Sequence, residues 1–157
     1  MTERVFNLLE LELAEPPERP PEGHQFRVAS PGRALGAAKT GLGVYEVEPG
    51  QTTWPYHFEA VEEEWLLVVA GELTLRTPDG EQRLVAGDVV CFPPGPAGAH
   101  AVRNDGSAAA RFAMPSSVAP YGDACVYPDS GKVRVSAPGF AHRGWLGEQV
   151  EYWEGEE

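Results

Sequence analysis

Short strand-like runs separated by turn residues are the feature of this 157-residue chain that most limits its fold. No segment shows the helical repeat of one apolar residue every three or four positions. Eighteen glycines and fifteen prolines supply the corners between the runs. We therefore predict an all-β sandwich or barrel. Its expected strands lie at residues 44–47, 65–69, 72–77, 82–85, 89–92 and 108–114.

One hairpin is expected between residues 72–77 and 81–85, because Pro78-Asp79-Gly80 separates them. An Asp-Gly pair readily adopts the positive φ that tight hairpin turns require. The run Trp-Leu-Leu-Val-Val-Ala at 65–70 is apolar on both faces, unlike a strand with one wet face. If Glu64, Leu66 and Val68 point into the barrel, then Trp65, Leu67 and Val69 point outward, and another part of the protein must cover them. An N-terminal arm or a second subunit could supply this cover, so we predict a homodimer.

The chain has the size of one domain. We divide it into an N-terminal arm at 1–25, with a proline-rich stretch at 15–22, and a barrel domain with a C-terminal tail at 26–157. The formal charge of −12 disfavours binding to nucleic acid or to anionic membrane surfaces. The sequence begins without a signal-like segment, and no apolar stretch approaches the ~20 residues that span a bilayer. We expect a cytoplasmic protein.

The two cysteines, Cys91 and Cys125, show no CxxC spacing, so we expect no disulfide framework. Cys91 lies in an apolar run and is expected to be a small buried core residue. His24 and His142 lie in glycine- and proline-rich stretches and are expected to be solvated surface imidazoles.

Two segments carry the candidate site. In a strand, residues two apart share a face, so His57 and Glu59 should point together into the barrel while Phe58 points away. Glu64 lies at an odd offset from Glu59, so it can face inward only if the chain turns near 62–63 and pairs back. His100 must come from another strand.

These segments resemble the paired motifs of the cupin superfamily. In the first motif, His57 and Glu64 fall into the family frame, with six residues between Glu64 and Gly71. Residues 127–133 and 150–155 resemble a bacterial subgroup of small single-domain cupins. The resemblance implies a double-stranded β-helix, the cupin jelly-roll barrel. The second motif is met by Gly87, Pro93, Gly95, His100 and Asn104.

One position departs from the family pattern, because Glu59 stands where the second histidine usually lies. The implied ligand set is His57, Glu59, Glu64 and His100, two imidazoles and two carboxylates around one divalent ion. Mn, Fe, Co, Ni or Zn would suit such a set. Glu63 is an alternative ligand to Glu64, although the spacing to Gly71 favours Glu64.

The resulting prediction is a divalent-metal-binding cupin that binds or transforms a small oxygen-rich organic molecule, as a metal-dependent dioxygenase or isomerase. Glu59 would be the catalytic residue, detaching to accept a proton. One alternative is a metal-free module that binds a sugar or another metabolite, with Glu59 paired to Arg111 or Arg103. Another is a structural protein whose barrel has no pocket.

Overall fold

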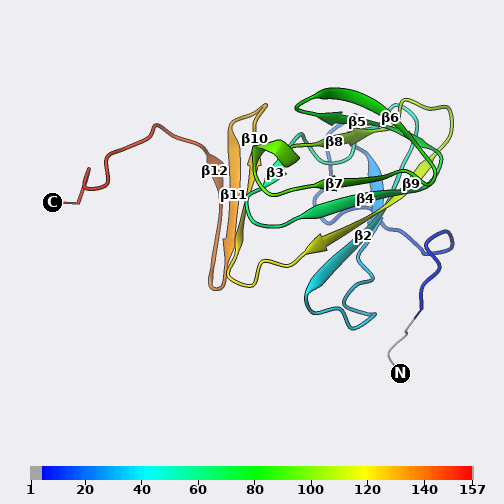
Figure 1. Cartoon of the computed structure of the whole chain (residues 1–157), viewed down its shortest axis with the longest axis horizontal. Helices are drawn as coiled ribbons and strands as arrows, with labels where there is room; N and C mark the ends of the chain where they lie inside the picture. The colour runs from blue at the N-terminus through cyan, green and yellow to red at the C-terminus, as the bar shows by residue number, and fades with distance from the viewer. Residues whose placement is uncertain (1–4, 157) are drawn as a thin grey trace.

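Twelve strands and one short 3-10 helix form the regular structure of residues 5–156, the part of the chain that this computed structural model describes (Figure 1). No α-helix occurs among these residues, which confirms the all-β prediction. None of their helices is long and apolar enough to cross a membrane. The largest sheet contains, in spatial order, β1 (Phe26–Ala29), β2 (Thr40–Val47), β9 (Ala110–Ser117), β4 (Glu64–Ala70) and β7 (Val89–Phe92).

Two smaller sheets complete the fold, and the C-terminal segment runs away from the barrel after the last strand (Figure 1). The 3-10 helix η1 (Pro96–Gly98) joins the largest sheet to one of them. The four-stranded sheet contains β12 (Phe140–Trp145), β11 (Lys132–Ala137), β10 (Asp123–Tyr127) and β3 (Phe58–Glu59). The three-stranded sheet contains β6 (Gly80–Val85), β5 (Glu72–Thr77) and β8 (Ala101–Arg103).

The expected hairpin is formed by β5 and β6, with Thr77 opposite Gly80 and a positive φ of 119° at Gly80. The expected alternation in β4 is also confirmed. Leu66 is fully buried, whereas the Trp65 side chain is 40% exposed. The apolar core therefore lies between the sheets and includes Phe26, Val47, Leu66, Val68, Leu73, Leu75, Leu84, Phe92, Val102, Phe112 and Met114.

Gly71 allows β4 to pass close to β9. The pairing of these strands shifts register between Val68 and Ala70, which marks a β-bulge. Gly71 follows with a φ of 78°, and a Cβ atom there would lie 2.8 Å from the Cα atom of Ala110. Only glycine fits both requirements without strain.

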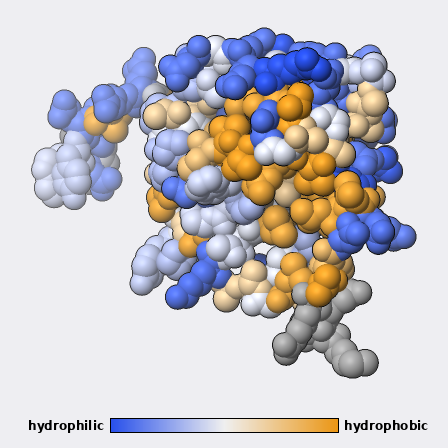
Figure 2. All heavy atoms as spheres, turned by 45° about the vertical axis from the view of Figure 1, so that its right-hand side comes forward, coloured by the Kyte–Doolittle hydropathy of each residue, from blue (hydrophilic) through white to orange (hydrophobic). Residues whose placement is uncertain are grey.

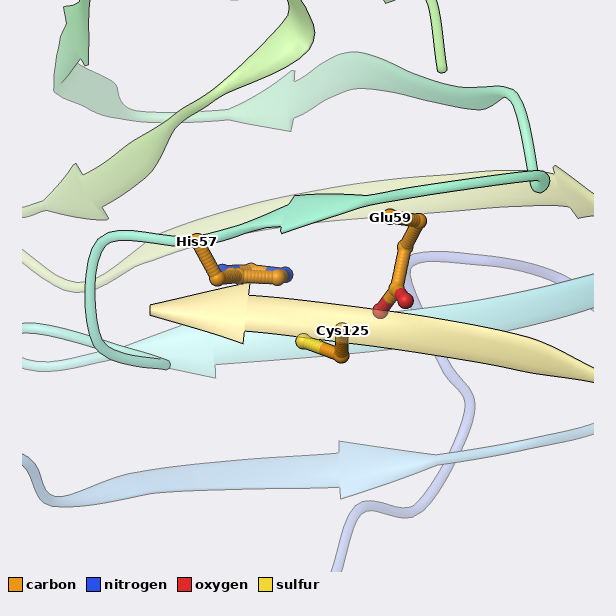
Figure 3. Close-up of side chains that lie close together, drawn as sticks. All are labelled: His57, Glu59 and Cys125. Carbon is orange, nitrogen blue, oxygen red and sulfur yellow. The ribbon is translucent and has the colours of Figure 1, made fainter. Parts of the chain in front are cut away.

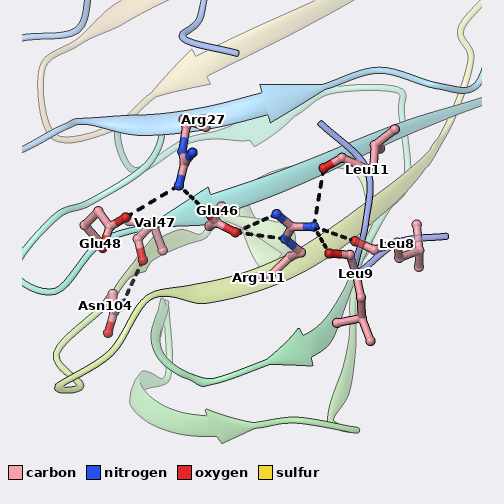
Figure 4. A network of polar contacts seen from close by, with 9 residues as sticks. All are labelled: Leu8, Leu9, Leu11, Arg27, Glu46, Val47, Glu48, Asn104 and Arg111. Atoms are coloured by element: carbon pink, nitrogen blue, oxygen red, sulfur yellow. Dashed lines mark hydrogen bonds and ion pairs between the residues drawn. The ribbon is translucent and has the colours of Figure 1, made fainter. Parts of the chain in front are cut away.

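Part of the N-terminal arm is fixed to the outer face of the largest sheet (Figure 4). Arg111 on β9 pairs with Glu46 on β2 at 2.6 Å, and its Nη1 donates to the carbonyl oxygens of Leu8 and Leu9 at 3.0 and 2.7 Å. A guanidinium can serve a carboxylate and several carbonyls together because it has five donors. The arm therefore covers the β2–β9 side of this face.

Cys91 is exposed, which contradicts its expected place in the core. Phe92 is buried against the core, and successive residues of a strand point to opposite faces. Cys91 must therefore face outward from β7, the edge strand of the largest sheet. His142 is exposed as expected, although it lies in β12. His24 is partly buried, and its Nδ1 bonds to the Thr53 carbonyl oxygen at 2.7 Å, so it is not a solvated imidazole.

Candidate metal centre

His57 and His100 lie directly opposite each other in an antiparallel bridge. The His57 amide donates to the His100 carbonyl at 3.1 Å, and the His100 amide donates to the His57 carbonyl at 2.8 Å. Their ring centroids are 4.7 Å apart. Residues 43 apart in sequence are thus presented as neighbours by the backbone itself.

The hydrogen bonds of the two rings assign their tautomers. His57 Nδ1 lies 2.8 Å from the Pro55 carbonyl oxygen, and His100 Nδ1 lies 2.9 Å from the Gly98 carbonyl oxygen. A carbonyl can only accept, so Nδ1 carries the hydrogen in both neutral rings. Each Nε2 is then left with a lone pair. The Nε2 atom of His100 is buried and has no hydrogen-bond partner among the described residues.

Glu64 brings a carboxylate to the same point. Its Oε2 atom lies 3.7 Å from His100 Nε2 and 3.9 Å from His57 Nε2. One ligand atom from each of these three residues lies within 4.8 Å of the others. The structure therefore brings together three of the four predicted ligands in a group that could hold a metal ion.

Burial governs the charge of this group. It lowers the pKa of His100 to about 3 and also lowers the pKa of His57. Burial, followed by the charge of Glu59, raises the pKa of Glu64 to about 7. Both imidazoles are therefore neutral at pH 7, and their contacts with Glu64 are not ordinary ion pairs. The Nε2 lone pairs of His57 and His100 and the carboxylate of Glu64 therefore face one space, which suits a cation.

The loop before β8 positions His100. Phe92 at the end of β7 stacks on the His100 ring with centroids 3.8 Å apart and an interplanar angle of 8°. Gly98 supplies the carbonyl that holds Nδ1, and it sits against Pro93, whose carbonyl oxygen would lie 1.9 Å from an added Cβ atom. A side chain at position 98 would move the backbone that orients His100.

Glu59 lies in a second group, beside His57 and Cys125 (Figure 3). Glu59 on β3 is the register partner of Cys125 on β10, so the two side chains share a face. Burial raises the pKa of Glu59, and burial raises the pKa of Cys125 to about 12, so its thiol is protonated at neutral pH. The structure does not bring Glu59 into the group of Glu64 and His100, and its role as a fourth ligand stays a prediction.

The chain turns between Glu59 and Glu64 as expected, but it does not pair back on itself. Strand β3 pairs with β10, whereas β4 pairs with β7 and β9. That prediction was wrong, because the two residues of β3 pair with β10, which lies more than sixty positions later in the chain. Glu63 is exposed, and its Oε1 atom accepts from Trp65 Nε1 at 2.8 Å on the outer face.

Asn104 is fully buried, and its side chain forms hydrogen bonds only with backbone groups. Its Nδ2 donates to the carbonyl oxygens of Val47 and Ala108, both at 2.8 Å, and its Oδ1 accepts from the Gly106 amide at 2.8 Å (the contact with Val47 is drawn in Figure 4). These bonds join the turn between β8 and β9 to the end of β2. Asn104 therefore stabilises the fold near His100.

Arg111 and Arg103 do not pair with Glu59, which removes one alternative suggested by the sequence. Arg111 pairs with Glu46, and Arg103 pairs with Glu81 and Asp105. The positive charge that acts on Glu59 comes from Arg134 on β11.

A cavity of about 600 Å³ opens beside these groups, so the barrel is not filled by side chains. That volume is within the usual range for small-molecule sites. Its walls come from the proline-rich arm, the motif strands and the four-stranded sheet. The lining includes Pro16, Glu18, Arg19, Pro21, His57, Glu59, Glu64, Cys125, Tyr127, Lys132, Arg134 and Arg143.

Sequence reasoning missed the contribution of the four-stranded sheet to this cavity. Cys125 and Tyr127 are two apart in β10, and Lys132 and Arg134 are two apart in β11. The alternation Lys-Val-Arg-Val-Ser at 132–136 is a strand signal that could have identified one wall. Nothing local indicated that this wall faces His57.

Comparisons with known proteins agree with the fold. Residues 43–115 match the family model of the Cupin domain. A candidate sugar phosphate isomerase from Acidithiobacillus ferrooxidans is 24% identical, with a TM-score of 0.79 over 92% of this chain and 93% of that one. A protein from Silicibacter pomeroyi, described as a sugar phosphate isomerase from a cupin superfamily, is 22% identical, with a TM-score of 0.78 over 94% and 97%.

A third solved structure is more distant. The polyketide cyclase RemF from Streptomyces resistomycificus is 22% identical, with a TM-score of 0.59 over 74% of this chain and 80% of that one. A search of the curated proteins found no match. The motif spacing, the double-stranded β-helix and the match at 43–115 agree: the central part of the chain matches the Cupin domain, and the chain has the same fold as these cupin structures.

Proposed function

We propose that this protein is a metal-dependent isomerase that moves a carbonyl group along a small sugar-like substrate. The observation that carries the proposal is the pair of Nε2 lone pairs on His57 and His100, which face the Glu64 carboxylate at 3.9 and 3.7 Å. Both rings are held in the tautomer that a metal ligand needs, by carbonyl oxygens at Nδ1.

The three residues fit a divalent ion. Metal–ligand bonds of about 2.0–2.2 Å allow two ligands of one ion to lie up to roughly 4.2 Å apart. Both observed separations from Glu64 are below that limit. A bound ion would also satisfy the buried Nε2 atom of His100, which otherwise bears the cost of an unpaired polar group. His57, Glu64 and His100 would hold the ion.

When bound, the ion would act as a Lewis acid that polarises the carbonyl and the neighbouring hydroxyl of the substrate. Glu59 would take the proton from the carbon that bears this hydroxyl and return it to the former carbonyl carbon. The hydroxyl proton passes to the carbonyl oxygen, so atoms and electrons balance without an oxidant. Glu59 suits this role because its carboxylate lines the cavity beside His57.

The choice of an isomerase over a dioxygenase rests on two points. Isomerisation needs a base and a Lewis acid, and the residues around the cavity can supply the first and hold the second. The two structures with TM-scores of 0.79 and 0.78 are both named as sugar phosphate isomerases, one of them as a candidate. A cavity of about 600 Å³ has room for a substrate of that size.

The test combines metal analysis with isomerisation. Protein purified without an affinity tag should contain about one equivalent of Mn, Fe, Ni or Zn per chain, and His57→Ala/His100→Ala should lose it. His142→Ala is the matched control, because this histidine is exposed on β12. In ²H₂O, a panel of aldoses, ketoses and their phosphates should include one that gains deuterium beside its carbonyl, and chelation should stop the exchange. Exchange that survives complete chelation contradicts the proposal.

A metal-free module that binds a metabolite is the second candidate, and the open cavity favours it. In that case a sugar would raise the melting temperature of chelated protein, and no substrate in the panel would exchange deuterium. Wild-type protein that contains no metal and takes up none would favour this candidate over the isomerase.

A further inference from the structure

Basic side chains gather on the inner face of the four-stranded sheet. Antiparallel pairing places Glu59, Cys125, Arg134 and Arg143 in one row across β3, β10, β11 and β12. Tyr127 and Lys132 are paired in the adjacent row. Directly opposed residues share a face, and all six of these side chains line the cavity.

Arg134 and Arg143 form a like-charged pair, since they face each other in the β11–β12 register. Two like charges directly opposite in a sheet are destabilising. Arg143 is compensated by Glu18 of the arm, through contacts of 3.0 and 3.1 Å. Among residues 5–156, Arg134 has no hydrogen-bond or ion-pair partner, and Lys132 only lies over the Tyr127 ring at 5.1 Å. Neither cation therefore forms an ion pair, although the charge of Arg134 also acts on Glu18, Glu59 and Glu64 at the cavity.

Basic side chains are as numerous as carboxylates around the cavity, unlike in the chain as a whole. The protein carries a formal charge of −12 with twelve lysines and arginines in all. Four of these twelve line the cavity (Arg19, Lys132, Arg134 and Arg143), and so do four carboxylates (Glu18, Glu59, Glu62 and Glu64). The charge of Arg134 also acts on His57, where it adds to the effect of burial in lowering the pKa of the imidazole. The guanidinium therefore acts on the space that a ligand would occupy.

We infer that Lys132 and Arg134 bind the phosphate group of a phosphorylated substrate. This inference rests on the proposed function and extends it by naming the substrate class and the residues that select it. A phosphate monoester carries a charge of about −1.5 to −2 at pH 7, which matches two cations that form no ion pair within the described residues. A carboxylate would carry half that charge. Arginine adds directed donors that fit phosphate oxygens.

The position of the pair also fits a substrate that reaches from the metal group. Arg134 lies two strands from Glu59, and neighbouring strands are about 4.8 Å apart, so their backbones are separated by roughly 10 Å. A short polyol chain and the extended Arg134 side chain can bridge this interval. The reacting carbonyl and the phosphate would then occupy opposite ends of the cavity.

The test uses inorganic phosphate and the chelated 157-residue chain, so that phosphate cannot bind to a metal. Calorimetric titration at pH 8 and constant ionic strength should show saturable binding of one phosphate per chain. Lys132→Gln/Arg134→Gln should weaken it at least tenfold, and Arg134→Lys should retain part of it. Arg83→Gln is the control, since Arg83 is exposed on β6 and pairs with Glu72. Acetate should bind at least tenfold more weakly than phosphate.

Unchanged phosphate affinity in the double variant, acetate binding as tight as phosphate binding, or no saturable binding in the wild type would overturn the inference. Melting curves of the variants establish that they are folded. The two proposals fail separately. Metal uptake and deuterium exchange without phosphate binding contradict only the phosphate site, whereas phosphate binding without metal or exchange contradicts only the proposed isomerase.

Discussion

His57 and His100 exchange both of their backbone hydrogen bonds across one antiparallel bridge, and each ring turns its Nδ1 back to a carbonyl two residues earlier in the chain. Backbone pairing therefore sets the distance between the two rings, and local carbonyls set their tautomers. A site built in this way is organised before any ligand binds.

The pH dependence of metal affinity should come from the titration of Glu64 alone. Burial raises the pKa of Glu64 to about 7 and lowers that of His100 to about 3. Below pH 7 a metal must displace the Glu64 proton, so affinity should fall about tenfold per pH unit and level off above pH 7. Mn²⁺ titrations from pH 5.5 to 8.5 measure this slope. A slope of two or more between pH 5.5 and 6.5 would mean that the imidazoles are also protonated.

Substitutions at Glu59 and Glu64 should distinguish a loss of catalysis from a loss of metal binding. Glu59→Gln keeps the His57–Glu64–His100 group intact and should lower isomerisation by about 10²- to 10⁴-fold at unchanged metal content, as expected for loss of a general base. Glu64→Gln should lose the metal itself. Elemental analysis and deuterium exchange on both variants provide the comparison. Metal loss in Glu59→Gln would instead make Glu59 the fourth ligand.

Gly98→Ala should disturb the centre through the backbone. An added Cβ atom would lie 1.9 Å from the Pro93 carbonyl oxygen, so the loop that orients His100 must move. We expect a loss of about 2 kcal/mol in the free energy of unfolding and a weaker metal site. Gly147→Ala is the control, because no atom lies within 4 Å of its added Cβ. Equal denaturation midpoints and metal affinities for the two variants would contradict the role given to Gly98.

A homodimer is expected through the outer face of β4 and β7. Trp65 and Val89 are 40% and 55% exposed there, and Figure 2 shows a broad apolar area on the barrel surface beneath a polar rim. Sedimentation should show a dimer, and Val89→Glu should shift it toward monomer. Val61→Glu is the control, since Val61 is 57% exposed in the loop between β3 and β4. A monomeric wild type at micromolar concentration would refute the expectation.

Local patterns predicted much of this structure. The Asp79-Gly80 turn, the alternation in β4 and the shared face of His57 and Glu59 all follow from periods of two residues or from turn chemistry. The pairing of β3 with β10 does not, because β3 has two residues and its partner is more than sixty positions away. The contributions of Cys125 and Arg134 follow from that pairing. They could not be inferred without the tertiary structure.

The contact between Glu18 and Arg143 has a consequence for how this barrel could diversify. It fastens the proline-rich arm to β12, so two segments outside the matched domain at 43–115 together wall the cavity. The candidate ligands and the proposed base lie inside that domain. Substitutions in these two segments could therefore change which substrate binds during evolution, while the candidate metal ligands and the proposed base stay the same.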